Sequence, residues 1–147
     1  EQAGNQPTYS VMLSSQGRFY TTSGPWLLEL DIDKRTWTVC AKPVDVPLYL
    51  SFTEGRDGTI FAGSYGQSRL VAIDPKTRRA EDLGLMDPSE MYLSRLATDD
   101  KGWVYCGIGV ARCNLVAFNT RTKERRQLVA ESERKPGTFS VPPGAAG

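Results

Sequence analysis

The 147-residue chain carries 18 basic and 17 acidic side chains, and its formal net charge of +1 gives no electrostatic argument for binding nucleic acid or an anionic membrane. With 39% hydrophobic and 24% charged residues, its composition is typical of a globular domain and excludes a disordered or fibrous chain. No stretch approaches the roughly 20 apolar residues of a membrane-spanning helix. We therefore expect neither nucleic acid nor a membrane as a partner.

In chain order, residues 1–7 resemble a flexible lead-in, and a first structural unit follows at 8–46. A strand is expected at 8–13, followed by a hairpin at 18–31. Residues 36–40 alternate between polar and apolar side chains, as in a half-exposed outer strand.

The second unit, 47–90, is organised around the turn dipeptide Asp57-Gly58, where glycine accepts a positive φ without a steric cost. β-Branched and aromatic residues follow this turn, and a later Asp-Pro pair closes the next apolar run. Strands are expected at 48–53, 59–63, 69–74 and 79–83. A polar connector at 86–90 leads onward.

The third unit, 91–130, repeats this pattern, with strands expected at 92–98, 103–107, 113–119 and 125–130. The tail, 131–147, is charged and then rich in proline and glycine. Within it, residues 138–141 resemble residues 8–11, so the tail is predicted to be a linker holding the first strand of a fourth unit.

Several anchors repeat with one period. The turn glycines Gly17, Gly58 and Gly102 are 41 and 44 residues apart. A period near 43 with four short strands predicts an all-β chain of three four-stranded antiparallel β-propeller blades. Three blades form an incomplete ring, because propellers typically have about 4 to 8. The expected partners are therefore further blades of the same polypeptide, which the partial fourth unit favours, or other copies of the chain.

Cys106 and Cys113 flank the predicted hairpin loop of the third unit. A disulfide between them requires Cα atoms within about 7 Å. The favoured alternative is buried thiols that pack as small hydrophobic groups. Because the chain has no histidine and few cysteines, we predict no metal site and no cofactor.

Ligands of propellers usually bind at one mouth of the central channel, beside the innermost strands. The predicted ligand-binding residues there are Tyr49, Tyr92, Arg95, Glu90 and Asp87, with Tyr49, Glu90, Tyr92 and Arg95 expected to be exposed. The two tyrosines occupy equivalent positions, where their rings could stack on the apolar face of a sugar or instead pack between blades. Asp87 and Glu90 form the one acidic pair that turn formation does not explain.

The densest basic set follows the third strand of units two and three. A solvated outer edge is the favoured explanation, and a nucleic-acid stripe is the alternative that lacks interleaved aromatic residues. Its members are Lys76, Arg78, Arg79, Arg121, Lys123, Arg125 and Arg126.

Residues 57–61 together with 69–77 resemble the blade signature of streptogramin-lyase-like and related bacterial propellers. The motif marks turns and core strands, so the resemblance implies the fold rather than an activity. Lyase members use histidine, an acidic residue and a divalent metal. Since this chain has no histidine, the resemblance does not carry lyase activity over.

Two functions remain open at this point. The favoured hypothesis is a non-catalytic propeller segment that binds a ligand, such as a glycan, or a protein partner at the channel mouth. The alternative is a fragment of a propeller-fold polysaccharide-active lyase or hydrolase, with its catalytic residues in other blades. We expect a periplasmic or secreted location rather than a cytoplasmic one, and no catalysis by this chain alone.

Overall fold

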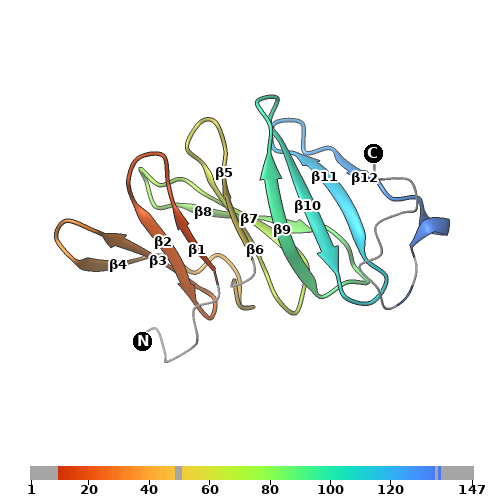
Figure 1. Cartoon of the computed structure of the whole chain (residues 1–147), viewed down its shortest axis with the longest axis horizontal. Coiled ribbons are helices and arrows are strands. Elements are labelled where there is room, and N and C mark those ends of the chain that lie inside the picture. The colour runs from red at the N-terminus through yellow and green to blue at the C-terminus, as the bar shows by residue number, and fades with distance from the viewer. Residues whose placement is uncertain (1–9, 49–50, 135, 137–147) are drawn as a thin grey trace, which may run out of the picture.

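The computed structural model describes residues 10–48, 51–134 and 136. In this part of the chain the fold is all-β, with three four-stranded antiparallel sheets that follow one another along the sequence (Figure 1). Among the described residues no helix is long and apolar enough to cross a membrane.

Each sheet is built from consecutive strands paired with their sequence neighbours. The first sheet contains β1 (Val11–Leu13), β2 (Phe19–Ser23), β3 (Trp26–Asp31) and β4 (Thr36–Ala41). The second contains β5 (Ser51–Glu54), β6 (Ile60–Gly63), β7 (Arg69–Ile73) and β8 (Ala80–Leu85). The third contains β9 (Tyr92–Thr98), β10 (Trp103–Gly109), β11 (Asn114–Asn119) and β12 (Arg125–Gln127), and a 3-10 helix, η1 (Glu131–Glu133), follows it.

The predicted turns form where glycine permits them. Gly58 and Gly102 both have φ of 86°, in the left-handed region that a side chain would strain. The Asp57 carboxylate accepts a hydrogen bond from the Thr59 amide at 3.0 Å, and Asp99 accepts one from Lys101 at 2.9 Å. The acidic residues before these glycines therefore fix turns, as the sequence predicted.

The sheets pack face to face through two apolar cores. Alternate residues of the second sheet point to opposite sides, so Ile60 and Val71 join the core against the first sheet while Phe61 and Leu70 join the core against the third. Between sheets, β9 lies against β5 and β6, and β1 lies against β5. First strands that converge in this way give the sheets a radial arrangement, with β1, β5 and β9 innermost.

Several strand ends differ from the sequence prediction. Leu48 is buried but lies before β5, which begins at Ser51, and β12 ends at Gln127 rather than at residue 130. The chain then leaves the sheet edge to form η1. The predicted fourth-unit strand at 138–141 lies outside the described residues, as does the lead-in at 1–7.

The predicted buried thiol is confirmed for Cys106 but not for Cys113, which is partly exposed. Cys106 lies opposite Val116 across the β10–β11 pair, and none of the three cysteines forms a disulfide. Cys106 is completely buried, and burial raises the pKa of its thiol to about 12. It packs as a small apolar side chain.

Candidate functional site

The candidate site lies at the end of the sheets where connectors run from one sheet to the next. Backbone hydrogen bonds hold these connectors to the loops inside the sheets. The Tyr65 amide donates to the Pro47 carbonyl at 2.8 Å, and the Met86 amide donates to the Ser68 carbonyl at 2.8 Å. We call this the connector end, and the turns at Gly17, Gly58 and Gly102 lie at the opposite end of the strands.

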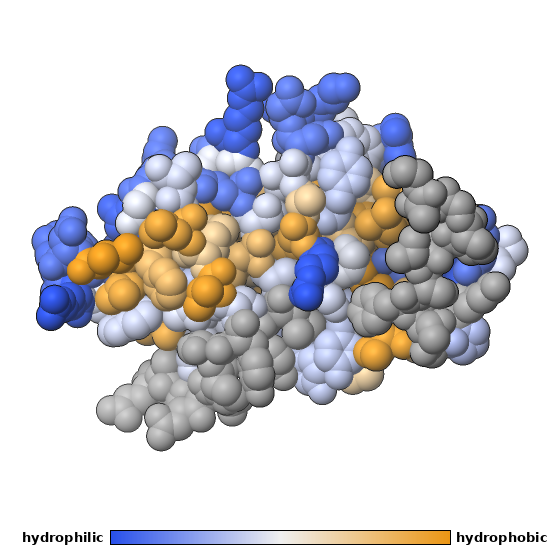
Figure 2. All heavy atoms as spheres, in the orientation of Figure 1, coloured by the Kyte–Doolittle hydropathy of each residue, from blue (hydrophilic) through white to orange (hydrophobic). Residues whose placement is uncertain are grey.

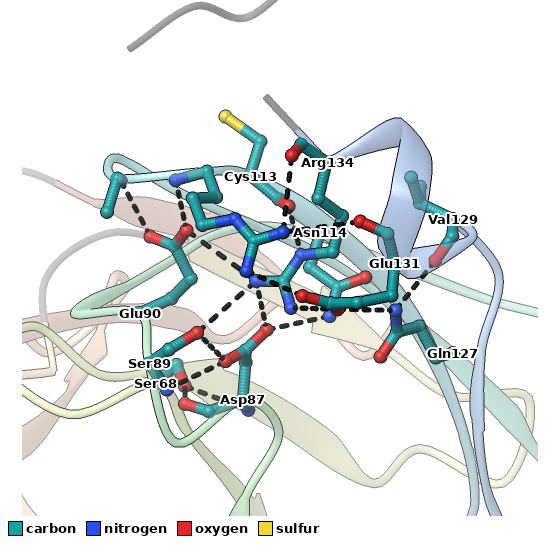
Figure 3. A network of polar contacts seen from close by, with 12 residues as sticks. Ser68, Asp87, Ser89, Glu90, Cys113, Asn114, Gln127, Val129, Glu131 and Arg134 are labelled. Carbon is teal, nitrogen blue, oxygen red and sulfur yellow. Dashed lines mark hydrogen bonds and ion pairs between the residues drawn. The ribbon is translucent and has the colours of Figure 1, made fainter. Parts of the chain in front are cut away.

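Asp87 is the centre of a buried polar network at the connector end (Figure 3). One carboxylate oxygen accepts hydrogen bonds from Asn114 Nδ2 and Arg134 Nη2, both at 2.7 Å. The other accepts from the amide of Ser89 at 2.8 Å and from its hydroxyl at 2.7 Å. Four donors on one carboxylate join the connector, β11 and the tail that follows the third sheet.

The same network sets the charge of Asp87. Burial alone would raise the pKa of this carboxyl group, since it penalises the charged form. The hydrogen bonds from Asn114 and Ser89 and the positive charge of Arg134 outweigh burial, and they lower the pKa below its ordinary value. Asp87 is therefore ionised at neutral pH.

Glu90, on the same connector, anchors the β10–β11 loop. Its carboxylate accepts hydrogen bonds from the amides of Ala111 at 2.8 Å and Arg112 at 2.6 Å. Its side chain is fully buried, and Arg134 Nη2 lies 3.8 Å from one carboxylate oxygen. The expectation that Glu90 is exposed is wrong, because this loop closes over it.

Sequence reasoning missed Arg134, which lies in the predicted linker. Its side chain is only 5% exposed, and it also donates to the Cys113 carbonyl at 2.9 Å and pairs with Glu131 at 3.0 Å. The acidic pair Asp87 and Glu90 was the one indication of such a residue, since buried carboxylates need a positively charged partner. Nothing in the sequence selects this arginine from the chain's 18 basic residues.

The predicted aromatic and basic positions fall on the innermost strand of the third sheet. Tyr92 is half-buried, and its ring meets that of Tyr65 edge to face with centroids 4.6 Å apart. Tyr92 therefore packs against a loop of the second sheet and stays partly open to solvent. Arg95 is exposed, as expected, and donates to the Ser94 carbonyl at 2.7 Å. Tyr49 lies outside the described residues.

Solved structures of other proteins have a similar architecture. The structure is similar to virginiamycin B lyase from Staphylococcus aureus, with a TM-score of 0.71 and 14% identity over 88% of this chain. A catalytically inactive histidine-to-alanine variant of that lyase with quinupristin gives the same TM-score, identity and coverage. The extracellular domain of a protein described as a one component system, from B. thetaiotaomicron, gives 0.68 with 16% identity over 92% of the chain.

The chain folds as three blades of a β-propeller. At these identities the likeness shows the fold alone. The chain spans 43% of the lyase and 18% of the extracellular domain, so both solved structures extend well beyond the matched blades. No protein-family model matches the sequence, and no curated protein matches it as a relative.

The connector end, where the chain enters the innermost strands β5 and β9, is the end at which a channel mouth was expected from the sequence. The opposite end holds a cavity of about 190 Å³ between the second and third blades, lined partly by Phe61, Trp103 and Arg121. Among the described residues, no three histidine, cysteine or acidic side chains gather where they could hold a metal ion. Asp87, Glu90 and Tyr92 lie at the opposite end of the blades from this cavity, and Arg95 lies midway along β9.

Proposed function

We propose that this chain is a non-catalytic segment of a β-propeller that binds a ligand at the connector-end mouth, with a glycan as the favoured ligand class. The observation that carries the proposal is that Tyr92 and Arg95 lie on the same face of β9, an innermost strand. A partly exposed tyrosine ring offers an apolar face for a pyranose, and an exposed guanidinium offers several fixed donors for hydroxyl or carboxylate oxygens.

Asp87 and Glu90 support this site in the proposal by holding its wall in place. Both carboxylates already accept hydrogen bonds from protein groups and are buried, so direct ligand contact falls to Tyr92 and Arg95. Tyr49, at the position equivalent to Tyr92 one repeat earlier, would supply a second ring at the same mouth.

A glycan array followed by titration calorimetry tests the proposal. Tyr92→Ala and Arg95→Ala should each weaken binding of the selected glycan about three- to tenfold, because a stacked ring or a charged hydrogen bond contributes roughly 0.5–1.5 kcal/mol or more. Tyr105→Ala and Lys101→Ala are matched controls away from the mouth and should leave the affinity unchanged. Equal losses in all four variants, or no binding to any glycan, would contradict it.

The alternative function is a piece of a propeller-fold polysaccharide-active lyase or hydrolase. The likeness to virginiamycin B lyase favours it, although 14% identity supports only the fold. Since these 147 residues contain no histidine, this alternative places the catalytic groups in other blades. Lyase and hydrolase assays on a polypeptide that includes further blades would support it if activity disappears on replacing a mouth-facing residue there.

A further inference from the structure

The outward face of the first blade is apolar and open. Its most exposed side chains are Val11 (64%), Leu13 (63%), Trp37 (56%) and Val39 (51%). Strand register places Leu13, Phe19, Leu30 and Trp37 in one row across the sheet, and Val11, Thr21, Leu28 and Val39 in the next. Figure 2 shows this apolar surface over the β1–β4 sheet. Thr21 is buried, and we call the seven apolar residues of these two rows the docking face.

The second blade shows what covers such a face. The equivalent positions of Phe19 and Leu30 in the second blade are Ile60 and Ile73, which pair across β6 and β7 in the same way. Both are at most 1% exposed, because the first blade packs on them. One repeat therefore buries the same face that the first blade leaves open.

A basic residue repeats beside this face. The fifth residue of the turn between the third and fourth strands of each blade has a positive φ, 57° at Arg78 and 60° at Lys123. Arg78 reaches back to Glu29 of the first blade at 3.4 Å, and Lys123 reaches back to Glu81 of the second blade at 3.0 Å. In both cases a cation at the turn pairs with a carboxylate of the preceding blade.

Arg35 holds the same turn position in the first blade, with φ of 53°, and its side chain is exposed. At the positions equivalent to Glu29 and Glu81, the third blade carries Ala117 and Arg126. A second copy that docked its third blade here would thus bring Arg126 toward Arg35, and the nearby carboxylate of Glu124 is already paired with Arg126 at 2.6 Å. Like charges oppose that association, so charge complementarity argues against a second copy.

We propose that the docking face binds a further four-stranded blade, different from the third blade, that carries a carboxylate on its third or fourth strand to pair with Arg35. The incoming blade covers the apolar rows as the first blade covers those of the second. The carboxylate fixes the register of the incoming blade, and β11 and β12 of the third blade carry no carboxylate, which disfavours closure by a second copy. The short span of this chain relative to the solved propellers agrees with further blades.

The test supplies such a blade from the chain itself. Residues 49–91 are duplicated in front of residue 8, which places a second copy of the Glu81-bearing face against the docking face in the natural register. Hydrogen exchange of the amides at 19–21 and 28–30 should slow about tenfold or more relative to the 147-residue chain, because covered strands open less often. Trp37 fluorescence should shift to shorter wavelength.

Charge reversal then tests the pairing. Glu81→Lys in the added copy should reduce the exchange protection, and Arg35→Glu in the same chain should restore it. If neither substitution changes the hydrogen-exchange protection, the proposed role of Arg35 is overturned. If the added blade gives the first blade no exchange protection, the proposed docking of a blade is overturned. An insoluble lengthened chain would overturn it as well. Dimers of the 147-residue chain in mass photometry that disappear on Trp37→Asp would make a second copy the occupant and also overturn the proposal.

Discussion

Replacing Arg134 by Met should destabilise the third blade far more than its place in a charged tail suggests. The change keeps much of the side-chain volume and removes the cation that faces Asp87 at 2.7 Å and Glu90 at 3.8 Å. Both carboxylates are buried, with side chains 3% and 0% exposed. Breaking a buried pair by removing one partner typically costs about 3–5 kcal/mol, because an uncompensated charge stays buried. This is a large fraction of the roughly 5–15 kcal/mol stability of an ordinary domain.

Urea unfolding measured by fluorescence and circular dichroism gives the cost directly. Lys34→Met is the matched control: Lys34 pairs with Asp31 at 3.1 Å, but its side chain is 77% exposed, so its loss should cost less than about 1 kcal/mol. Adding Asp87→Asn to Arg134→Met should recover part of the loss, since the amide no longer needs a cation. An Arg134→Met cost as small as that of Lys34→Met would refute the reasoning.

Three further predictions follow from the same packing and electrostatics. Gly63→Ala should destabilise the chain by about 1–3 kcal/mol in thermal unfolding, because the added methyl would lie 2.7 Å from Leu93 Cδ2 on the neighbouring blade; an unchanged melting temperature would contradict it. Asp87, whose folded-state pKa is lowered, contributes stability above about pH 4 that is lost as the pH falls through that lower pKa, and Asp87→Asn should flatten the acid limb of urea unfolding against pH. Cys113 should react with a thiol reagent well before Cys106, whose burial raises its pKa to about 12, and equal rates would indicate that the third blade opens readily.

The parts of the fold that local chemistry determines were predictable from the sequence. Asp57-Gly58 forms its turn because glycine takes the positive φ and the aspartate caps the following amide, interactions contained within three residues. This glycine turn recurs after 41 and then 44 residues, which fixes the strand count between copies. The limits of β9 follow from the repeat and match the prediction, 92–98.

The parts that depend on long-range contacts were not predictable. Glu90 was expected at the surface, but the loop that buries it lies about 20 residues further along the chain and approaches only when β10 and β11 pair. Tyr65 was not singled out as a neighbour of Tyr92, because the two rings come from different blades. A sequence pattern gives the face on which a side chain lies, whereas its partner on the next blade depends on how the blades stack.

The basic residues of the turns show how the same pattern supports two explanations. In the sequence they resemble a solvated edge, which explains their number without any partner. Arg78 and Lys123 do lie at that edge, and both also pair with a carboxylate of the preceding blade. Partly exposed pairs of this kind contribute at most about 1 kcal/mol each, so the apolar cores provide most of the adhesion between blades. The charges instead discriminate between neighbours, since a blade without the carboxylate meets an unpaired cation. An ion pair at Arg35 would therefore select which blade packs beside the first one, although the pair itself contributes little to stability.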